Sequence, residues 1–247
     1  PKIILGSISG FGQDGPYGKR PGFDQIAQGM GGLMWITGTP GQGPMRVGVP
    51  IADLASGLYA AIGILTALLQ REETGEGQWV HTSLLEAQVA MLDFQAARWL
   101  MADDVPGQAG NNHPTGIPTG VFKTTDGYIN IAASGGQMWD RLCGVLGAED
   151  LHDDPDYADG AARLRNRDAL NEKLQRYFSQ KSSEAWVEVL NEASVPCGPI
   201  YHMDEMWSDP QIQHLEMARE VTPSASGAKA VVRNATNLSG VAKTTYR

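Results

Sequence analysis

Helical periodicity is the clearest pattern in the distribution of apolar residues along the chain. Apolar residues recur at helical spacing from Leu54 to Arg71, where Ala, Leu and Ile dominate and small residues lie on one side. The same spacing predicts a short helix over 23–30 and a long helix over 84–101. Later helices are predicted through Trp139, Leu142 and Leu146, over 167–178 and over 183–193.

Runs of β-branched and alternating residues predict strands between these helices. Residues 2–8 form a β-branched run closed by a glycine-rich turn, which indicates a buried strand followed by a loop. A second strand is predicted at 78–81 and a short apolar strand near 198–201. From Thr119 to Ala133 two alternating runs are joined through Asp126-Gly127, which is a strong hairpin signal.

Two segments are too rich in Gly and Pro to form regular elements. The segment 37–50 contains four glycines and three prolines and leads directly to Asp53. Loops of that length inside a compact domain are more often functional than not. The segment 107–118 is rich in Gly, Pro and Asn, and it indicates a boundary between a first domain and a second, mixed α+β domain.

The composition argues against a nucleic-acid-binding protein, a membrane-spanning protein and a disulfide-rich secreted protein. The chain has 28 acidic and 19 basic residues and a net charge of −9, which argues against nucleic-acid binding because that requires clustered cations. No uninterrupted apolar stretch reaches the length of a membrane span. Two cysteines in unlike contexts predict no disulfide framework and favour the cytoplasm. The first residues resemble neither an initiation site nor a signal peptide, and we expect them to be internal to a longer protein.

The sequence gives little support for a dinucleotide-binding turn, a metal site or a reactive cysteine. Gly10-x-Gly12-x-x-Gly15 fits the dinucleotide-binding pattern, but prolines follow where that pattern requires a helix. The five histidines have no metal-ligand spacing, so no metal site is predicted. Cys197 has no basic neighbour in sequence that would favour a thiolate, and it is interpreted as a small buried residue.

Asp53 and a later glycine pair remain as candidates for chemistry. On pattern alone, Asp53 precedes an apolar helix and is best interpreted as its N-cap. A carboxylate at a helix N-terminus is also kept ionised, which suits a nucleophile. The Ser134-Gly135-Gly136 segment is either an ordinary turn or a loop whose backbone N–H groups face a developing oxyanion, and the sequence does not choose between these.

Several segments, taken together and in order, resemble the family III CoA-transferases, also called the carnitine dehydratase and bile-acid-inducible F family. The resemblance spans nearly the whole chain. The segments that carry it in the first half are Ile8–Tyr17, Arg20–Asp24, Ala27–Gly32, Val47–Asp53 with Gly57, Gly75–Gln78 and Ser83–Glu86. Those in the second half are Asp126-Gly127, Gly135–Gln137, Asn166-Arg167 and Val195–Pro199.

The resemblance implies a reaction and roles for particular residues. Members exchange CoA between an acyl-CoA thioester and a free carboxylic acid through aspartyl-anhydride and aspartyl-CoA intermediates, without a metal. Asp53 occupies the position of the nucleophile. Gly135, Gly136 and Gln137 correspond to the glycine-rich segment that covers the intermediate. Pro21, Gly22, Phe23 and Asp24 fall where the family contacts the tail of coenzyme A.

The resemblance also implies an architecture. We expect an α/β fold in which residues 1–112 form part of a Rossmann-like large domain with long helices. Residues 113–225 would form a smaller α+β domain, and 226–247 would return toward the large domain. The family further implies an interlocked homodimer, with acyl-CoA and a small carboxylic acid as the other partners. The apolar runs, which are too short for a membrane span, lead us to expect no membrane partner.

Two alternatives remain open at this point. Racemases of the same family carry a His-Asp pair where this chain has Phe23-Asp24, so the absence of an imidazole weakens a racemase function. The family also has a further N-terminal region and a C-terminal tail, and we expect this chain to begin after the first and to stop before the second. The second alternative is therefore a truncated, non-catalytic fragment that acts only as a folded interaction domain.

Overall fold

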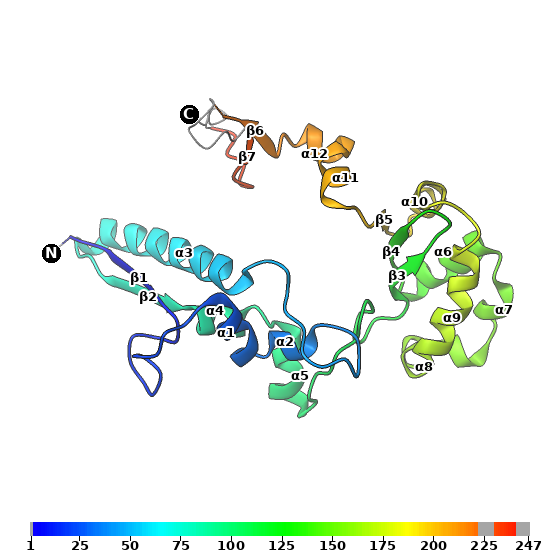
Figure 1. The fold of residues 1–247 in the computed structure, drawn as a ribbon, viewed down its shortest axis with the longest axis horizontal. Helices are drawn as coiled ribbons and strands as arrows, with labels where there is room; N and C mark the ends of the chain where they lie inside the picture. Colours follow the sequence, from blue (N-terminus) through cyan, green and yellow to red (C-terminus); the bar gives the residue numbers. More distant parts are fainter. Residues whose placement is uncertain (1, 222–229, 241–247) are drawn as a thin grey trace. The chain divides into compact units, whose positions relative to one another are not determined.

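The chain forms two compact units in a computed structural model that describes residues 2–221 and 230–240 (Figure 1). Unit 1 comprises residues 1–120 together with 159–167, and unit 2 comprises 121–158 together with 168–247. The domain limits drawn from the sequence at 112 and 225 stay predictions. Residues 226–229 and 241–247 of the expected return segment lie outside the described residues.

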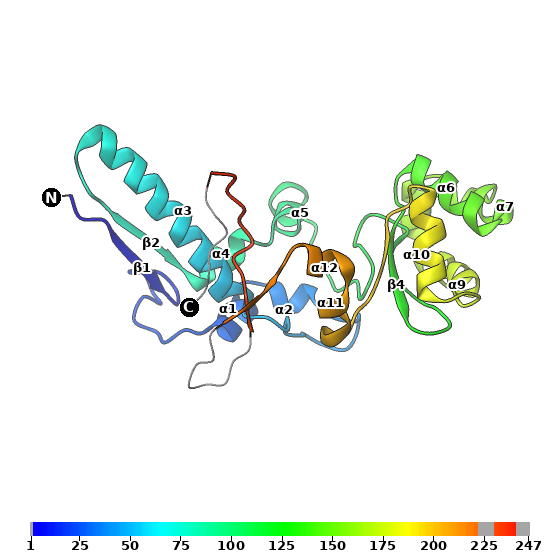
Figure 2. The ribbon, with the colours of Figure 1, turned by 90° about the horizontal axis from the view of Figure 1, so that it is seen from above.

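Unit 1 is organised around two parallel strands and one long helix. Strand β1 (Leu5–Ser9) pairs in parallel with β2 (Trp79–Ser83), with Leu5 opposite Trp79 and Ser9 opposite Ser83. Helix α3 (Ile51–Thr74) lies in the connection between them and packs against both strands (Figure 2). Parallel strands joined through a helix are the unit from which α/β folds are built.

Shorter helices complete unit 1. They are α1 (Asp24–Met30), α2 (Leu33–Ile36), α4 (Leu84–Ala90), α5 (Phe94–Ala102) and α8 (Gly160–Arg165). Residues 10–23 form turns with no helix after the glycines, as expected from the prolines there. The segment 37–50 is likewise free of helix and strand, which confirms the predicted loop.

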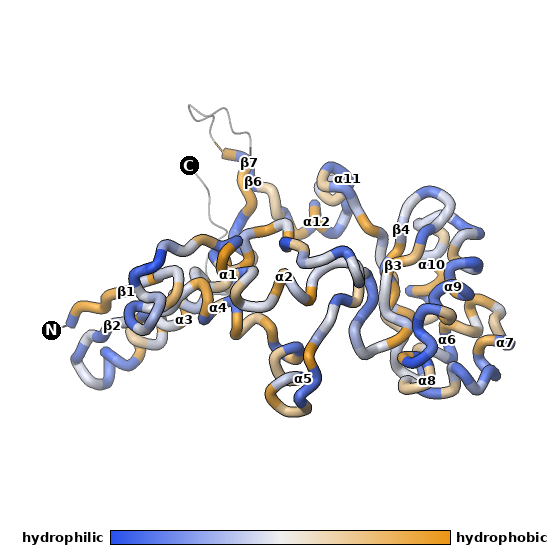
Figure 3. Tube along the Cα trace, turned by 60° about the horizontal axis from the view of Figure 1, so that its bottom comes forward, coloured by the Kyte–Doolittle hydropathy of each residue, from blue (hydrophilic) through white to orange (hydrophobic). Residues whose placement is uncertain are grey.

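Two predictions for unit 1 were wrong in detail. The first strand was expected to be buried, but Leu5 and Ile8 of β1 are 56% and 49% exposed. In the described part of the chain, β1 pairs with β2 alone, so its apolar residues (orange in Figure 3) stay largely uncovered. The predicted helix over 84–101 is two helices, because Asp93 adopts a φ of +48° that an α-helix cannot accommodate.

Helix α3 has one face packed in unit 1 and an apolar face that is not. The packed face consists of small residues, including Ala52, Ala55 and Ala60. The exposed face is a stripe at helical spacing, in which every side chain is at least 53% exposed: Leu54, Leu58, Ile62, Leu65 and Leu69. This helix is long and apolar enough to cross a bilayer, although the sequence shows no uninterrupted apolar run of that length. Length and hydropathy do not decide the matter, because the core helices of soluble proteins also meet these two criteria.

The first turn of α3 is held by a side chain from a different helix. Asp24, at the start of α1, is 6% exposed, and its Oδ1 accepts a hydrogen bond from the Ala52 N–H at 2.9 Å. Its Oδ2 accepts a second bond, of 2.7 Å, from the amide of the fully buried Gln28. A helix begins with backbone N–H groups that have no partner in the helix, and here a distant carboxylate supplies one.

Gln28 also binds the loop that precedes α3. Its Nε2 donates to the Val49 carbonyl at 3.2 Å, and its Oε1 accepts from the Val47 N–H at 3.0 Å. The loop that enters α3 is therefore fixed by two buried polar side chains of α1. This network sets where α3 begins and which way its first turn faces.

Unit 2 contains a three-stranded sheet in the order β3-β4-β5. Strands β3 (Thr119–Lys123) and β4 (Tyr128–Ala132) flank Asp126-Gly127, which confirms the predicted hairpin, and β5 (Cys197–Pro199) pairs antiparallel with β4. The helices that follow the hairpin are α6 (Gly136–Leu146), α7 (Glu149–His152), the 3₁₀ turn η1 (Pro155–Tyr157), α9 (Arg167–Phe178) and α10 (Ser183–Glu192). Helix α9 has the bounds predicted from the sequence.

An aromatic cluster forms part of the core of unit 2. Phe178 of α9 lies 4.8 Å from Phe122 of β3 and 5.3 Å from Trp186 of α10, measured between ring centroids. Ile129 and Ile131 of β4 are fully buried, as the alternating pattern of the hairpin predicts. The chain then continues through α11 (Met203–Ser208), α12 (Pro210–His214), β6 (Ala218–Glu220) and β7 (Ala230–Val232).

Replacing Asp24 should destabilise unit 1. In Asp24→Ala the buried Ala52 N–H and the Gln28 amide each lose an acceptor, which we expect to lower the free energy of unfolding by about 1–3 kcal/mol. Urea denaturation of the protein and the variant measures the loss. Asp14→Ala, which removes an exposed loop carboxylate, is the control and should change the free energy by less than about 0.5 kcal/mol. Equal stability of the two variants would contradict a capping role for Asp24.

His152 should make unit 2 more stable at acidic than at basic pH. Its Nδ1 lies 2.9 Å from Asp153 Oδ1 and its Nε2 lies 3.3 Å from Asp140 Oδ1, and these hydrogen bonds raise the pKa of the imidazole. The stabilisation is complete below the unfolded pKa of about 6.5 and is lost as pH rises through the folded pKa. His152→Gln should therefore lower Tm more at pH 5 than at pH 8. An NMR titration that gives His152 a pKa below 6.5 would contradict this.

Candidate active site

Asp53 lies in the first turn of α3 and does not cap the helix. The helix begins at Ile51, its N-cap is Pro50, and the Leu54 N–H donates to the Pro50 carbonyl at 3.0 Å. The N-cap interpretation of Asp53 was therefore wrong, because the helix starts earlier than the sequence indicated and Asp24 supplies the acceptor that it needs.

The Asp53 carboxylate is exposed and not engaged. Within residues 2–221 and 230–240, it makes no hydrogen bond or ion pair. Only its backbone carbonyl is used, as an acceptor for the Ser56 hydroxyl at 2.9 Å. The N-terminal end of a helix carries a partial positive charge, which attracts negatively charged groups. A carboxylate with no hydrogen-bonding partner is available to react with an electrophile.

The four residues expected to contact coenzyme A have different environments. Pro21 and Phe23 lie at the surface, and Phe23 is 77% exposed, which is unusual for so large an apolar side chain. Gly22 packs against Gly10, where a Cβ on either residue would lie 2.8 Å from the Cα of the other. Asp24 is buried and engaged with Ala52 and Gln28. Of the four, Pro21 and Phe23 offer the accessible apolar side chains.

Gly135, Gly136 and Gln137 stand at the start of α6 in unit 2. Gly135 is the N-cap, and the helix begins at Gly136, so the expected loop is shorter than the sequence indicated. A Cβ added at Gly135 or Gly136 would meet nothing within 4 Å, and neither has a positive φ, so the fold itself does not require glycine at either position. The first intrahelical bond runs from the Trp139 N–H to the Gly135 carbonyl, which leaves the preceding N–H groups outside the helical ladder.

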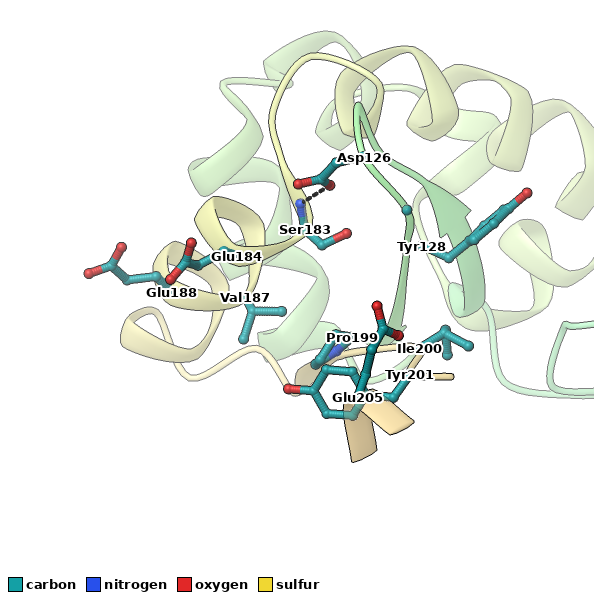
Figure 4. A pocket seen from close by; sticks show the side chains of 11 residues that line it. Asp126, Tyr128, Ser183, Glu184, Val187, Glu188, Pro199, Ile200, Tyr201 and Glu205 are labelled. Atoms are coloured by element: carbon teal, nitrogen blue, oxygen red, sulfur yellow. Dashed lines mark hydrogen bonds between the residues drawn. The ribbon is translucent and has the colours of Figure 1, made fainter. Parts of the chain in front are cut away.

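Unit 2 also has a pocket of about 580 Å³ that the sequence did not indicate (Figure 4). Carboxylates and tyrosines from β4, α10, α11 and the loops beside them line it: Asp126, Tyr128, Glu184, Glu188, Tyr201 and Glu205. Asp126 accepts a hydrogen bond from the Ser183 N–H at 2.8 Å, and this bond lowers the pKa of its carboxyl group. Negative walls repel acyl-CoA and carboxylic acids, so this pocket is a poor candidate for their binding.

Other nucleophiles and metal ligands are poorly placed in the described residues. Cys197 was expected to be a small buried residue, but it is only half-buried. This partial burial raises the pKa of its thiol to about 11, so the thiol is protonated at neutral pH. No group of three or more His, Cys, Asp or Glu side chains suited to a metal ion gathers in residues 2–221 and 230–240. Asp53 therefore remains the best candidate for covalent chemistry.

Known proteins resemble this chain over most of its length. It is 36% identical to human succinyl-CoA:glutarate CoA-transferase over 221 residues, which are 90% of this chain and 50% of that protein. It is 35% identical to acetyl-CoA:oxalate CoA-transferase of Acetobacter aceti over 212 residues, which are 85% of this chain and 54% of that protein. The crystal structure of a CAIB/BAIF family protein from Brucella suis matches with a TM-score of 0.81 at 35% identity, over 97% of this chain and 62% of that one.

The chain spans about half the length of these curated relatives. Their likeness nevertheless extends through both units, and the mixed α/β fold is that of the Brucella suis structure. The family model described as CoA-transferase family III matches residues 1–247. The chain belongs to CoA-transferase family III.

Proposed function

We propose that this protein transfers CoA between an acyl-CoA thioester and a free carboxylic acid, and that Asp53 is the residue acylated. The observation that carries the proposal is the Asp53 carboxylate itself, which is exposed, unengaged and placed in the first turn of a 24-residue helix. A carboxylate that capped the helix would have to give up a hydrogen bond in order to react. Asp24 removes that conflict by accepting the bond in its place.

The reaction conserves the free energy of the thioester in four steps. An Asp53 oxygen attacks the thioester carbonyl, the C–S bond breaks, and a mixed anhydride and CoA thiolate result. The thiolate attacks the aspartyl carbonyl and releases the first acid as its carboxylate, which leaves an aspartyl thioester. The acceptor carboxylate attacks that thioester and expels CoA thiolate. The thiolate then attacks the new acyl group, which forms the product thioester and restores Asp53.

Each intermediate is susceptible to hydrolysis, so water must be kept from Asp53. We assign this role to Gly135, Gly136 and Gln137, as the family resemblance suggests. Two features support the assignment: neither glycine is required by its local surroundings, and N–H groups at the start of α6 are outside the helical ladder. Backbone N–H groups of this kind stabilise the oxyanion that forms when a carbonyl is attacked.

Coenzyme A acts as a substrate in this scheme, and the surface around Pro21 suits its tail. Phe23 offers an exposed apolar face, and the guanidinium of Arg20 lies 3.8 Å from the centre of the Tyr17 ring in the preceding loop. An exposed apolar side chain three residues from an arginine in sequence fits a molecule with an apolar arm and phosphates. The same resemblance leads us to expect a homodimer. A racemase function gains no support, because Phe23 stands where the racemases have a histidine and cannot act as a base.

The acceptor acid is proposed to be a dicarboxylic acid. The two relatives described above act, by name, on glutarate and on oxalate, and each of these acids has two carboxyl groups. One carboxylate must attack the aspartyl thioester. The other is an additional negative charge that the site has to accommodate.

Asp53→Asn should abolish transfer and leave the fold intact. An amide does not form the anhydride, so we expect the rate of CoA exchange to fall at least about a thousandfold. The carboxylate makes no hydrogen bond, so the free energy of unfolding should change by less than about 1 kcal/mol. Exchange is measured by chromatography of acyl-CoA species, and the acylated residue is identified by trapping with hydroxylamine and mass spectrometry.

The matched control is Glu72→Gln, which removes an exposed carboxylate near the other end of α3 and should leave exchange unchanged. Full exchange activity in Asp53→Asn, or a hydroxamate on another residue, would rule out the assignment of Asp53.

A further inference from the structure

Arg46 has a guanidinium group that the fold uses only weakly. Its side chain is 41% exposed, and its two contacts are long: 3.7 Å to Asp24 Oδ2 and 3.5 Å to the Gly48 carbonyl. A guanidinium has five N–H donors in a planar arrangement that matches a carboxylate. Most of the capacity of Arg46 to donate hydrogen bonds is therefore unused in the described structure.

The Asp24 carboxylate does not depend on Arg46 for its hydrogen bonds. Both of its oxygens already accept short bonds, one from Ala52 and one from Gln28. Arg46 adds charge compensation at a distance longer than that of a direct charge-assisted hydrogen bond. If Arg46 only balanced the charge of Asp24, its positive charge would be explained. The exposure of its N–H donors would not be explained.

The same carboxylate links Arg46 to the first turn of the helix that carries Asp53. Asp24 contacts Arg46 through one oxygen and the Ala52 N–H through the other, and Ala52 directly precedes Asp53 in the first turn of α3. The loop that carries Arg46 is held by the bonds of Gln28 to Val47 and Val49. The cation is thus attached to a fixed loop next to the start of the helix.

We infer that Arg46 is a specificity-determining residue that binds the second carboxylate of a dicarboxylic acid, the one that does not react at Asp53. The inference rests on the proposed transfer reaction and extends it to the choice of acid. A chain with a net charge of −9 disfavours dianionic substrates unless a local cation compensates. A guanidinium recognises a carboxylate through two parallel hydrogen bonds, which gives geometric selectivity as well as attraction.

Arg46→Met tests this inference with a matched pair of acceptor acids. Glutarate and its monoamide have the same length and differ in one carboxylate. We expect the variant to raise KM for glutarate about ten- to hundredfold, with a smaller change in kcat, and to leave KM for the monoamide within about twofold. Arg46→Lys keeps a charge without the planar fork, and we expect it to recover part of the selectivity for glutarate.

A control variant and a second readout separate the possible roles of Arg46. Arg71→Met removes a cation near the other end of α3 and should change neither KM. If Arg46 acts only by balancing the charge of Asp24, then Arg46→Met lowers stability in urea and weakens both acids equally, and the inference fails. A higher KM for acyl-CoA whatever the acyl group would instead assign Arg46 to a phosphate of coenzyme A and would also overturn it.

The outcome for Arg46 can be told apart from the outcome for the proposed function. If the protein exchanges no CoA with any acid, the proposed function fails. Calorimetric titration with glutarate and with the monoamide then still measures recognition of the second carboxylate. Preferential binding of glutarate that is lost in Arg46→Met supports the inference, and equal binding of both acids before and after the substitution contradicts it.

Discussion

The hydrogen bond from the Ala52 N–H to the Asp24 carboxylate is the contact on which the site depends. It satisfies a backbone donor in the first turn of α3 from a helix 28 residues earlier in the chain. Because this donor is satisfied from outside, Asp53 does not have to cap its own helix. Within the described residues, the carboxylate is left exposed and without a hydrogen-bonding partner, at the position that we propose for the covalent chemistry.

Burial of Asp24 requires further support, and the surrounding residues provide it. Gln28 donates to one oxygen of Asp24 and also anchors the loop 37–50 through Val47 and Val49. Arg46, on that loop, supplies a nearby positive charge. A buried carboxylate is costly unless it is hydrogen-bonded and its charge is compensated, and this network meets both conditions. Asp24 and Gln28 therefore hold the start of the helix and the loop that carries the candidate recognition cation, Arg46.

Elements with strong local signals could be predicted from the sequence. The hairpin at Asp126-Gly127 and helix α9 follow from turn chemistry and periodicity, which are properties of neighbouring residues. The break at Asp93 was missed, because apolar spacing continues across it and a single backbone angle ends the helix. The exposure of β1 was also missed, since burial depends on which strands and helices cover an element and not on its own residues.

The site was only partly accessible to sequence reasoning. Pattern alone favoured Asp53 as an N-cap, and the assignment as nucleophile came from the family resemblance. Asp24 and Gln28 hold the start of α3 and its preceding loop, and Arg46 lies near Asp24, through contacts across 19 or more positions that no local pattern reveals. The pocket around Asp126 and Tyr201 likewise combines residues from separate elements.

The central claim is that an Asp53 oxygen becomes part of the intermediate, and oxygen isotopes test it most directly. The protein would be turned over with an acyl-CoA donor and an acceptor acid labelled with ¹⁸O in its carboxylate, and the peptide containing Asp53 would then be analysed by mass spectrometry. When CoA thiolate attacks the second anhydride at the acceptor carbonyl, one labelled oxygen remains on the aspartate. The account predicts ¹⁸O in the Asp53 carboxylate, whereas formation of the product thioester with no label on Asp53 would contradict it.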